Sequence, residues 1–303
     1  MTDLIGDIHG YACKLQILLL KLGYTNKNGA YGHPERKVLF IGDYIDRGPE
    51  IPRTLELVKA MVDSGNAIAL MGNHEYNALC FHFPETKGGH LRKHLIKNIL
   101  QHHETLRQFQ NKQDQYEMYI DWFKTLPLYH ETEHFRAVHA CWDVDNIAYL
   151  QKRLVNGCLS DELIYESAEE GTKLKDVIEQ TLKGMELKMP GNGIFSDKDG
   201  TDRTHIRIKW WENPAHMTYK SISVEPIPNL PDQAINPADM SSAHWYQEND
   251  RKVFFGHYWL RGEPSLYRNN ICCLDYSVAR QGKLVAYRLN GEERLDNKNF
   301  VYV

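Results

Sequence analysis

The sequence predicts a layered α/β fold, because short apolar strands alternate with amphipathic helices through the first third of the chain. Residues 38–41 form a continuous apolar run, which is typical of a buried strand. Residues 11–22 place leucines on one helical face, and Gly23 follows as a stop signal. This alternation favours a layered core in which active-site residues gather beyond the carboxyl ends of the strands.

The other elements of this first third carry their own signals. Residues 4–5 are the apolar end of a first strand. Residues 51–62 repeat apolar side chains at helical spacing, prolines stand at its start, and Gly65 ends that helix. Residues 67–71 are apolar again and predict the next buried strand. Together these elements form a βαβαβ unit.

The rest of the chain is organised around a second set of strands, which we expect at 135–138, 253–255, 271–274 and 283–288. A mostly helical insert, about 76–134, precedes the first of them. A less orderly insert, about 145–250, follows it, and its helical part ends near residue 184. The simplest architecture is a single domain spanning residues 1–303, in which the second insert forms a cap or flap beside the site.

The composition is that of an ordinary globular protein, with 42% hydrophobic and 25% charged residues, so we do not expect disorder. The formal net charge is −4, and basic and acidic residues are mixed along the chain. A nucleic-acid partner is not expected, because a phosphate track would need a basic stripe. A small anionic substrate fits, because bound cations would supply local positive charge.

The six cysteines form no CxxC pair, which argues against a zinc finger and against a disulfide framework. We therefore expect reduced thiols and a cytoplasmic location. The chain does not open with a charged segment followed by an apolar stretch, so no signal peptide is expected. No apolar run has the length of a membrane span, and a membrane partner is not expected.

Short blocks of polar residues follow five of the predicted strands, where a rigid sheet can aim side chains at a common point. Their carboxylates, imidazoles and single amide suit a pair of divalent cations. One such block alone is more often a turn or a helix cap, but five in this order are not explained that way. The blocks are Gly-Asp-Ile-His-Gly at 6–10, Gly-Asp-Tyr-Ile-Asp-Arg-Gly at 42–48, Gly-Asn-His-Glu at 72–75, Val-His-Ala at 138–140 and Gly-His at 256–257.

These blocks resemble the calcineurin-like metallophosphoesterase superfamily. The resemblance is closest to its phosphoprotein-phosphatase branch, which includes bacterial serine/threonine phosphatases and symmetrical diadenosine tetraphosphatases. Two features narrow the resemblance to this branch. The full motif Asp-Tyr-Ile-Asp-Arg-Gly follows Gly42. Tyr-Trp-Leu follows His257, so the second histidine that nuclease-like relatives carry in this motif is absent. The resemblance implies a central β-sandwich flanked by helices, with a dimetal site at the strand ends. It covers about residues 1–80, 118–143 and 253–290.

Carried over position by position, the resemblance implies metal ligands from all five blocks. The expected ligands are Asp7 and His9 for the first cation, Asp43 bridging both cations, and Asn73, His139 and His257 for the second. We expect Mn²⁺ in an assay, and the ligand types leave iron, zinc, nickel and cobalt open. A water or hydroxide held between the two cations would attack phosphorus in line with the leaving group.

The same resemblance implies roles for polar residues beside the ligands. His74 would face the leaving oxygen, and Asp46 would orient its ring and keep a proton available. Arg47 would grip the non-bridging phosphate oxygens, and its alternative is a structural salt bridge with Asp46 or Glu50. Arg207 is our candidate for a second phosphate-binding cation, although an alternating strand with solvent-facing cations explains it equally well.

We therefore expect a metal-dependent phosphatase that hydrolyses phosphomonoesters. One alternative is a dinucleoside polyphosphate hydrolase of the diadenosine tetraphosphate type, and one from another class is a catalytically weak metal-binding scaffold. A nuclease is disfavoured by the missing second histidine and by the acidic charge. The expected substrates are a phosphoprotein, a small phosphomonoester or a dinucleoside polyphosphate.

Aromatic residues of the second insert bear on this choice of substrate. They are expected to form the core of the insert, with a base-stacking platform for a nucleotide as the alternative. The residues are Phe195, Trp210, Trp211 and Trp245.

Overall fold

Two β-sheets form the centre of the protein, as seen in a computed structural model that describes residues 1–86, 88–196, 202–228, 230–236 and 245–303. The first sheet has the strand order β14–β15–β1–β4–β5, and β16 pairs with β15. Its parallel part is β1 (Thr2–Ile5), β4 (Lys37–Phe40) and β5 (Ala67–Ala69), as the βαβαβ pattern predicts. The antiparallel part is β14 (Asp275–Tyr276), β15 (Lys283–Leu289) and β16 (Phe300–Tyr302).

The second sheet has the order β13–β12–β7–β6. Its parallel strands are β7 (Phe135–Val138), β12 (Lys252–Phe255) and β13 (Ile271–Cys273), and β6 (Tyr129–Glu131) joins β7 antiparallel. Leu39 of the first sheet and Phe254 of the second share the buried cluster between the sheets. Their neighbours Phe40 and Phe255 point the other way, into the cluster beneath the helices. The expected β-sandwich is therefore confirmed.

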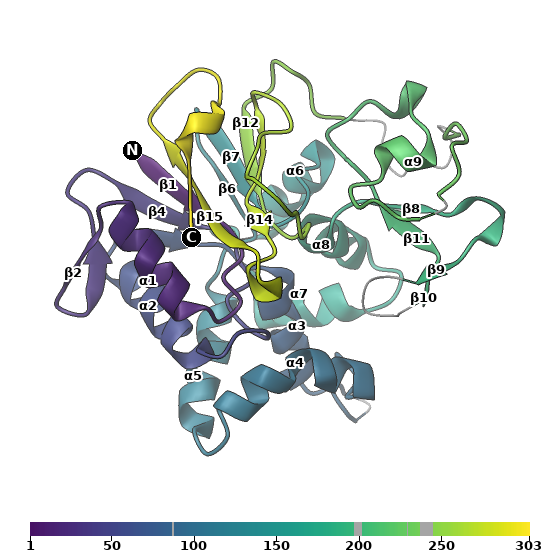
Figure 1. The fold of residues 1–303 in the computed structure, drawn as a ribbon. Helices are drawn as coiled ribbons and strands as arrows, with labels where there is room; N and C mark the ends of the chain where they lie inside the picture. Colours follow the sequence, from purple (N-terminus) through teal and green to yellow (C-terminus); the bar gives the residue numbers. More distant parts are fainter. Residues whose placement is uncertain (87, 197–201, 229, 237–244) are drawn as a thin grey trace.

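Helices cover the outer faces of both sheets (Figure 1). On the first sheet lie α1 (Ala12–Lys21) and α2 (Ile51–Asp63), and α2 begins with Pro52 in its first turn. A short hairpin that the sequence patterns did not predict, β2 (Thr25–Lys27) with β3 (Ala30–Gly32), lies beside them. Near the second sheet lie α6 (Val144–Arg153), α7 (Asp161–Ala168) and α8 (Lys173–Lys183).

Three helices make up most of the first insert: α3 (Asn73–His82), α4 (Ile96–Gln108) and α5 (Gln113–Lys124). Figure 1 shows α4 and α5 at the foot of the molecule, below α2 and α3. In the described residues, no helix combines the length and the apolar character that crossing a membrane requires.

The second insert is described except for 197–201, 229 and 237–244, so part of it lies outside the described residues. Its helical part ends with α8, close to the predicted residue 184. Trp210 and Trp211 are buried in the main core cluster and Phe195 packs against it, as the core interpretation predicts. Trp245 is exposed and does not follow that interpretation. That this insert acts as a cap or flap stays a prediction. The short elements that follow α8 are β8 (Glu186–Lys188), η1 (Pro190–Asn192), β9 (Phe195–Ser196), β10 (Asp202–Arg203), β11 (His205–Arg207), η2 (Pro214–His216) and α9 (Tyr219–Ile222).

Candidate metal centre

The loops that follow β1, β4, β5, β7 and β12 meet at one end of the sandwich and carry the predicted ligands. These strands are the parallel ones of the two sheets, so their carboxyl ends point to the same region. All the predicted ligand side chains are buried there. They are Asp7, His9, Asp43, Asn73, His139 and His257.

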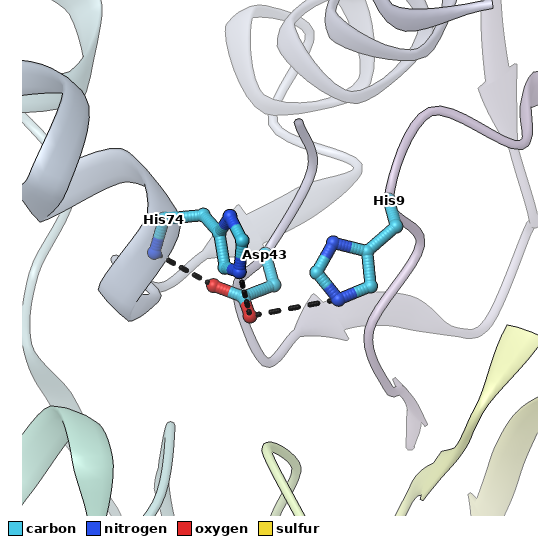
Figure 2. A group of neighbouring side chains, drawn as sticks. All are labelled: His9, Asp43 and His74. Carbon is cyan, nitrogen blue, oxygen red and sulfur yellow. Dashed lines mark hydrogen bonds and ion pairs between the residues drawn. The ribbon is translucent and has the colours of Figure 1, made fainter. Parts of the chain in front are cut away.

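Asp43 lies at the middle of this group. Its Oδ2 atom is 3.7 Å from His9 Nε2, 3.5 Å from His139 Nε2 and 3.9 Å from His74 Nε2. Figure 2 shows the His9 and His74 rings directed at the Asp43 carboxylate from different elements. A carboxylate shared in this way is placed as a bridging ligand would be.

Asn73 forms a second meeting point next to Asp43. Its Oδ1 atom is 3.0 Å from His139 Nε2 and 2.8 Å from His257 Nδ1. Asp7 is tied to the same region, because its Oδ2 accepts a 3.1 Å hydrogen bond from the His257 backbone N–H. The structure therefore brings all six predicted ligands together.

Backbone carbonyls hold two of the imidazoles in place. His9 Nδ1 is 2.9 Å from the Ile45 carbonyl oxygen, and His139 Nδ1 is 3.0 Å from the Ile41 carbonyl oxygen. In each ring the Nδ1 contact leaves Nε2 directed at Asp43. Contacts of this kind fix the ring orientation of metal-ligating histidines.

The backbone at the site is strained. Among the described non-glycine residues, positive φ angles occur at His9 (49°), Asp43 (56°), Asp46 (83°) and His257 (73°). Such angles cost about 1–3 kcal/mol each and cluster at functional sites. Gly72 permits a close approach beside them, because a Cβ atom there would lie 2.2 Å from Asp43 Oδ1.

The electrostatics of the buried cluster favour the binding of positive charge. Burial raises the pKa of Asp7 well above its usual value, and the charges of Asp275 and Asp43 add to that rise. Burial alone would lower the pKa of His139, but the Asp43 and Asp7 carboxylates outweigh it and raise that pKa to about 10. The carboxylates thus favour positive charge at this position, which a divalent cation would supply.

The residues fit divalent cations by their chemistry. Carboxylate, imidazole and amide donors suit borderline-to-hard ions, and two groups of three ligand atoms lie within 4.8 Å of one another: His9, Asp43 and His74, and Asp43, His139 and His257. His9 Nε2 and His257 Nε2 are buried without a hydrogen-bond partner. Unpaired buried nitrogens are costly unless a ligand satisfies them.

His74 and Asp46 form a close pair beside the cluster. His74 Nδ1 lies 2.6 Å from Asp46 Oδ2. Burial would raise the pKa of Asp46, but the charges of His102 and His74 and their hydrogen bonds hold it well below its usual range. Burial would lower the pKa of His74, but Asp43 and Asp46 raise it overall. The geometry is that of an imidazole oriented by an ionised carboxylate.

Among the described contacts, Arg47 forms no salt bridge with Asp46 or Glu50, which was the alternative to phosphate binding. Glu50 pairs with Arg53 at 2.7 Å, and the Asp46 carboxylate accepts from two imidazoles. The Nε atom of Arg47 is buried without a hydrogen-bond partner. Its guanidinium carbon lies 5.0 Å from the centre of the Trp259 ring.

Arg207 lies on β11, where Nη1 is 3.6 Å from Glu225 Oε1. Burial lowers the pKa of His257 well below its usual value, and the positive charge of Arg207 lowers it further. A role for Arg207 in phosphate binding stays a prediction.

Trp259 and Arg280 were not predicted at the site. The Trp259 ring is 5.6 Å from the His9 ring between centroids, and Arg280 lies 5.3 Å from the Trp259 ring centre. Arg280 ends the short helix η4 (Val278–Arg280), which follows β14. The only sequence signal was that Trp259 stands where nuclease-like relatives have their second histidine.

Glu75 also has a role that motif matching did not assign. Its carboxylate accepts hydrogen bonds from the backbone N–H groups of Asp43 (2.9 Å), Tyr44 (2.8 Å) and Gly72 (3.0 Å). It therefore ties two ligand-bearing loops together. Its bond from the Gly72 N–H is one half of a capping box, and the other half is absent because the N-cap residue Gly72 has no side chain.

The family model for calcineurin-like phosphoesterases, Metallophos, matches residues 2–258. The asymmetrical bis(5'-nucleosyl)-tetraphosphatase PrpE of Halalkalibacterium halodurans is 31% identical over 179 residues, which cover 57% of this chain and 70% of that protein. The symmetrical bis(5'-nucleosyl)-tetraphosphatase of a Marinomonas species is 26% identical over 311 residues, which cover 97% of this chain and 95% of that protein.

One solved structure supports the fold assignment. It is a protein serine/threonine phosphatase from Saccharomyces cerevisiae with similarity to human phosphatase PP5. The match has a TM-score of 0.50 at 15% identity and covers 100% of this chain and 78% of the other. At that identity the match bears on the fold alone.

Proposed function

The chain belongs to the calcineurin-like phosphoesterase family, and from that premise we propose that it is a metal-dependent phosphatase acting on phosphomonoesters at the site around Asp43. Hydrolysis of phosphoester or phosphoanhydride bonds is the activity of the family. We propose manganese as the ion that supports turnover. The residues that would hold two ions are Asp7, His9, Asp43, Asn73, His139 and His257.

One observation carries this proposal. Asp43 Oδ2 lies 3.7 Å from His9 Nε2, a candidate ligand atom, and 3.9 Å from His74 Nε2, a candidate proton donor. His9, a proposed metal ligand, and His74, a proposed acid, thus face the same oxygen of Asp43. This supports a reaction in which a phosphate bound at the metals loses a leaving group that takes a proton from His74. A metal-binding scaffold would have no use for the His74–Asp46 pair.

The residues divide the chemistry between them. When bound, the two cations supply an activated water and offset the negative charge of the phosphoryl oxygens. His74 would carry a proton at Nε2 and give it to the departing oxygen, while Asp46 accepts from Nδ1 and holds the ring in place. Arg47 and Arg207 would bind non-bridging oxygens, and the planar guanidinium of arginine suits two such contacts.

A second candidate function is hydrolysis of a dinucleoside polyphosphate. It is favoured by Trp259, whose ring lies beside His9, and by Arg280, a further cation that lies beside the Trp259 ring. A nucleotide anhydride has bases that stack on aromatic rings and extra phosphates that pair with arginine. The relatives named above as bis(5'-nucleosyl)-tetraphosphatases point to the same class.

The test is manganese-dependent turnover of para-nitrophenyl phosphate, a phosphopeptide, diadenosine tetraphosphate and bis-para-nitrophenyl phosphate. Wild type is compared with Asp43→Asn and His74→Asn. The proposal predicts turnover of a monoester that both substitutions reduce by about 100-fold or more, as expected for a lost ligand or acid. Turnover of diadenosine tetraphosphate alone would favour the second candidate. Bound manganese with no hydrolysis of any substrate would favour the scaffold.

A further inference from the structure

We propose that His102 and Thr105 of α4 are positioning residues that hold the Asp46 carboxylate in the orientation His74 needs. This inference rests on the proposed function, because it assigns a task to the first insert in that same site. Neither residue belongs to a block that follows a strand. Both reach Asp46 only because α4 packs beneath the site.

The carboxylate of Asp46 accepts three short hydrogen bonds. His74 Nδ1 lies 2.6 Å from Oδ2, while His102 Nδ1 and Thr105 Oγ1 each lie 2.6 Å from Oδ1. The two residues of α4 thus occupy one oxygen and leave the other to His74. Since all four side chains are buried, water does not compete for these contacts.

Thr105 also holds the Asp46 backbone. The Asp46 N–H donates to Thr105 Oγ1 at 3.1 Å, while the same hydroxyl donates to the Asp46 carboxylate. Asp46 has a φ of 83°, a conformation that a residue with a side chain rarely adopts. Strain of this kind persists only when surrounding contacts fix it, and Thr105 provides two of them.

His102 is held in turn from its far side. Its Nε2 lies 2.5 Å from the Tyr116 hydroxyl on α5, and that hydroxyl is 3.0 Å from His82 Nε2 at the end of α3. Tyr116 also stacks on Phe109, with ring centroids 4.9 Å apart. The imidazole of His102 is therefore fixed at both nitrogens, so it cannot turn away from Asp46 without breaking two buried hydrogen bonds.

The alternative is that this network only satisfies buried polar groups and stabilises α4. The two interpretations differ in which substrates they affect. A positioning role affects the step in which the leaving oxygen takes a proton, so it matters most for substrates with a basic leaving group. A purely structural role lowers the rate for all substrates alike.

The experiment measures manganese-dependent kcat for phenyl phosphate, whose leaving group is basic, and for 2,4-dinitrophenyl phosphate, whose leaving group needs no proton. The variants are His102→Leu, which removes the donor, and His102→Asn, which keeps a donor near the Nδ1 position. Thr105→Val and Thr105→Ser form the second pair. His103→Leu is the matched control, because it makes the same change on the same helix at an exposed side chain. Bound manganese and thermal midpoint are measured for every variant.

We expect His102→Leu and Thr105→Val to lower kcat for phenyl phosphate by about 100-fold, with less than about a threefold loss for 2,4-dinitrophenyl phosphate. The conservative variants His102→Asn and Thr105→Ser should keep most of the activity that His102→Leu and Thr105→Val lose, and His103→Leu should match wild type. Equal losses on both substrates, or none, with manganese still bound, would overturn the proposal. If His102→Leu does not fold, the comparison of Thr105→Val with Thr105→Ser on the two substrates tests the proposal. If the wild type itself turns over no substrate, the proposed function fails, which separates the two claims.

Discussion

Gly256 and Asp7 are packed so closely that a Cβ atom at Gly256 would lie 2.0 Å from Asp7 Oδ1. The residue after Gly256, His257, donates its backbone N–H to the same carboxylate at 3.1 Å. The loop after β12 and the loop after β1 are thus in direct contact at a proposed ligand. Glycine is required at this position by space and not by its φ angle.

Gly256→Ala should therefore displace Asp7 and lower manganese affinity by about 10-fold or more, the range seen when contacts that orient a metal ligand are lost. Manganese binding by isothermal titration calorimetry measures this directly. Gly29→Ala controls for backbone strain outside the ligand loops, because Gly29 has a φ of 91° and an added Cβ there would meet nothing within 4 Å. Unchanged manganese affinity in Gly256→Ala would show that Asp7 is not a ligand.

Arg47→Lys should lower kcat/KM for para-nitrophenyl phosphate by about 10-fold or more, because a lysine cannot make the paired contacts of a guanidinium. Steady-state kinetics with saturating manganese provide the measurement. Arg53→Lys is a nearby control, since Arg53 is exposed and pairs with Glu50. Equal effects of the two substitutions would argue against phosphate binding by Arg47.

Arg280→Gln should discriminate between substrates. We expect the KM for diadenosine tetraphosphate to rise by about 10-fold, the cost of one charge-assisted contact, with little change for para-nitrophenyl phosphate. The reason is that Arg280 stands beyond Trp259, which is 5.6 Å from His9 between ring centroids. A parallel rise for both substrates, or none for either, would count against the second candidate function.

His82→Gln should make the protein less sensitive to acid. Burial, and then the nearby charge of His102, lower the pKa of His82 from 6.5 to about 4. Between these two pKa values the unfolded chain therefore binds more protons than the folded chain. As a result, the folded state loses stability as the pH falls from about 6.5 towards 4. Glutamine does not titrate and keeps a group near Tyr116.

The expected result is similar stability of wild type and His82→Gln at pH 7.5, and about 1–2 kcal/mol less acid-induced loss for the variant at pH 5. Urea unfolding with a chelator present measures both values, so that metal binding does not contribute. An equal loss in the variant and in wild type would mean that the pKa of His82 is not lowered.

The strand-end ligands could be predicted from sequence, because each block has a local signature: an apolar strand, a glycine and a polar side chain. The assignment of Asp7, Asp43 and His139 as ligands came from the family resemblance, and their strands belong to two different sheets. The β-sandwich itself came from the family resemblance, since the spacing of strands does not show which sheet each one joins. The hairpin β2–β3 was missed because its strands are short and β2 is exposed.

The supporting residues could not be predicted in this way. His102 and Thr105 lie mid-helix, and nothing within α4 distinguishes them from other polar residues until the helix is packed against Asp46. Trp259 lies between β12 and β13, whereas Arg280 lies between β14 and β15, so only tertiary packing brings the two side chains together. Arg207 came from the family resemblance, and its pairing with Glu225 was not foreseen.

The most direct test of a two-cation hydrolytic centre is to titrate manganese into chelator-treated protein while measuring bound metal and para-nitrophenyl phosphate turnover in the same samples. We predict two bound ions per chain, with turnover appearing as the second binds, and a loss of about 100-fold or more in Asp43→Asn. Full turnover with one ion or none bound, or an Asp43→Asn variant that keeps wild-type turnover, would contradict the assignment of Asp43 as the residue both cations share.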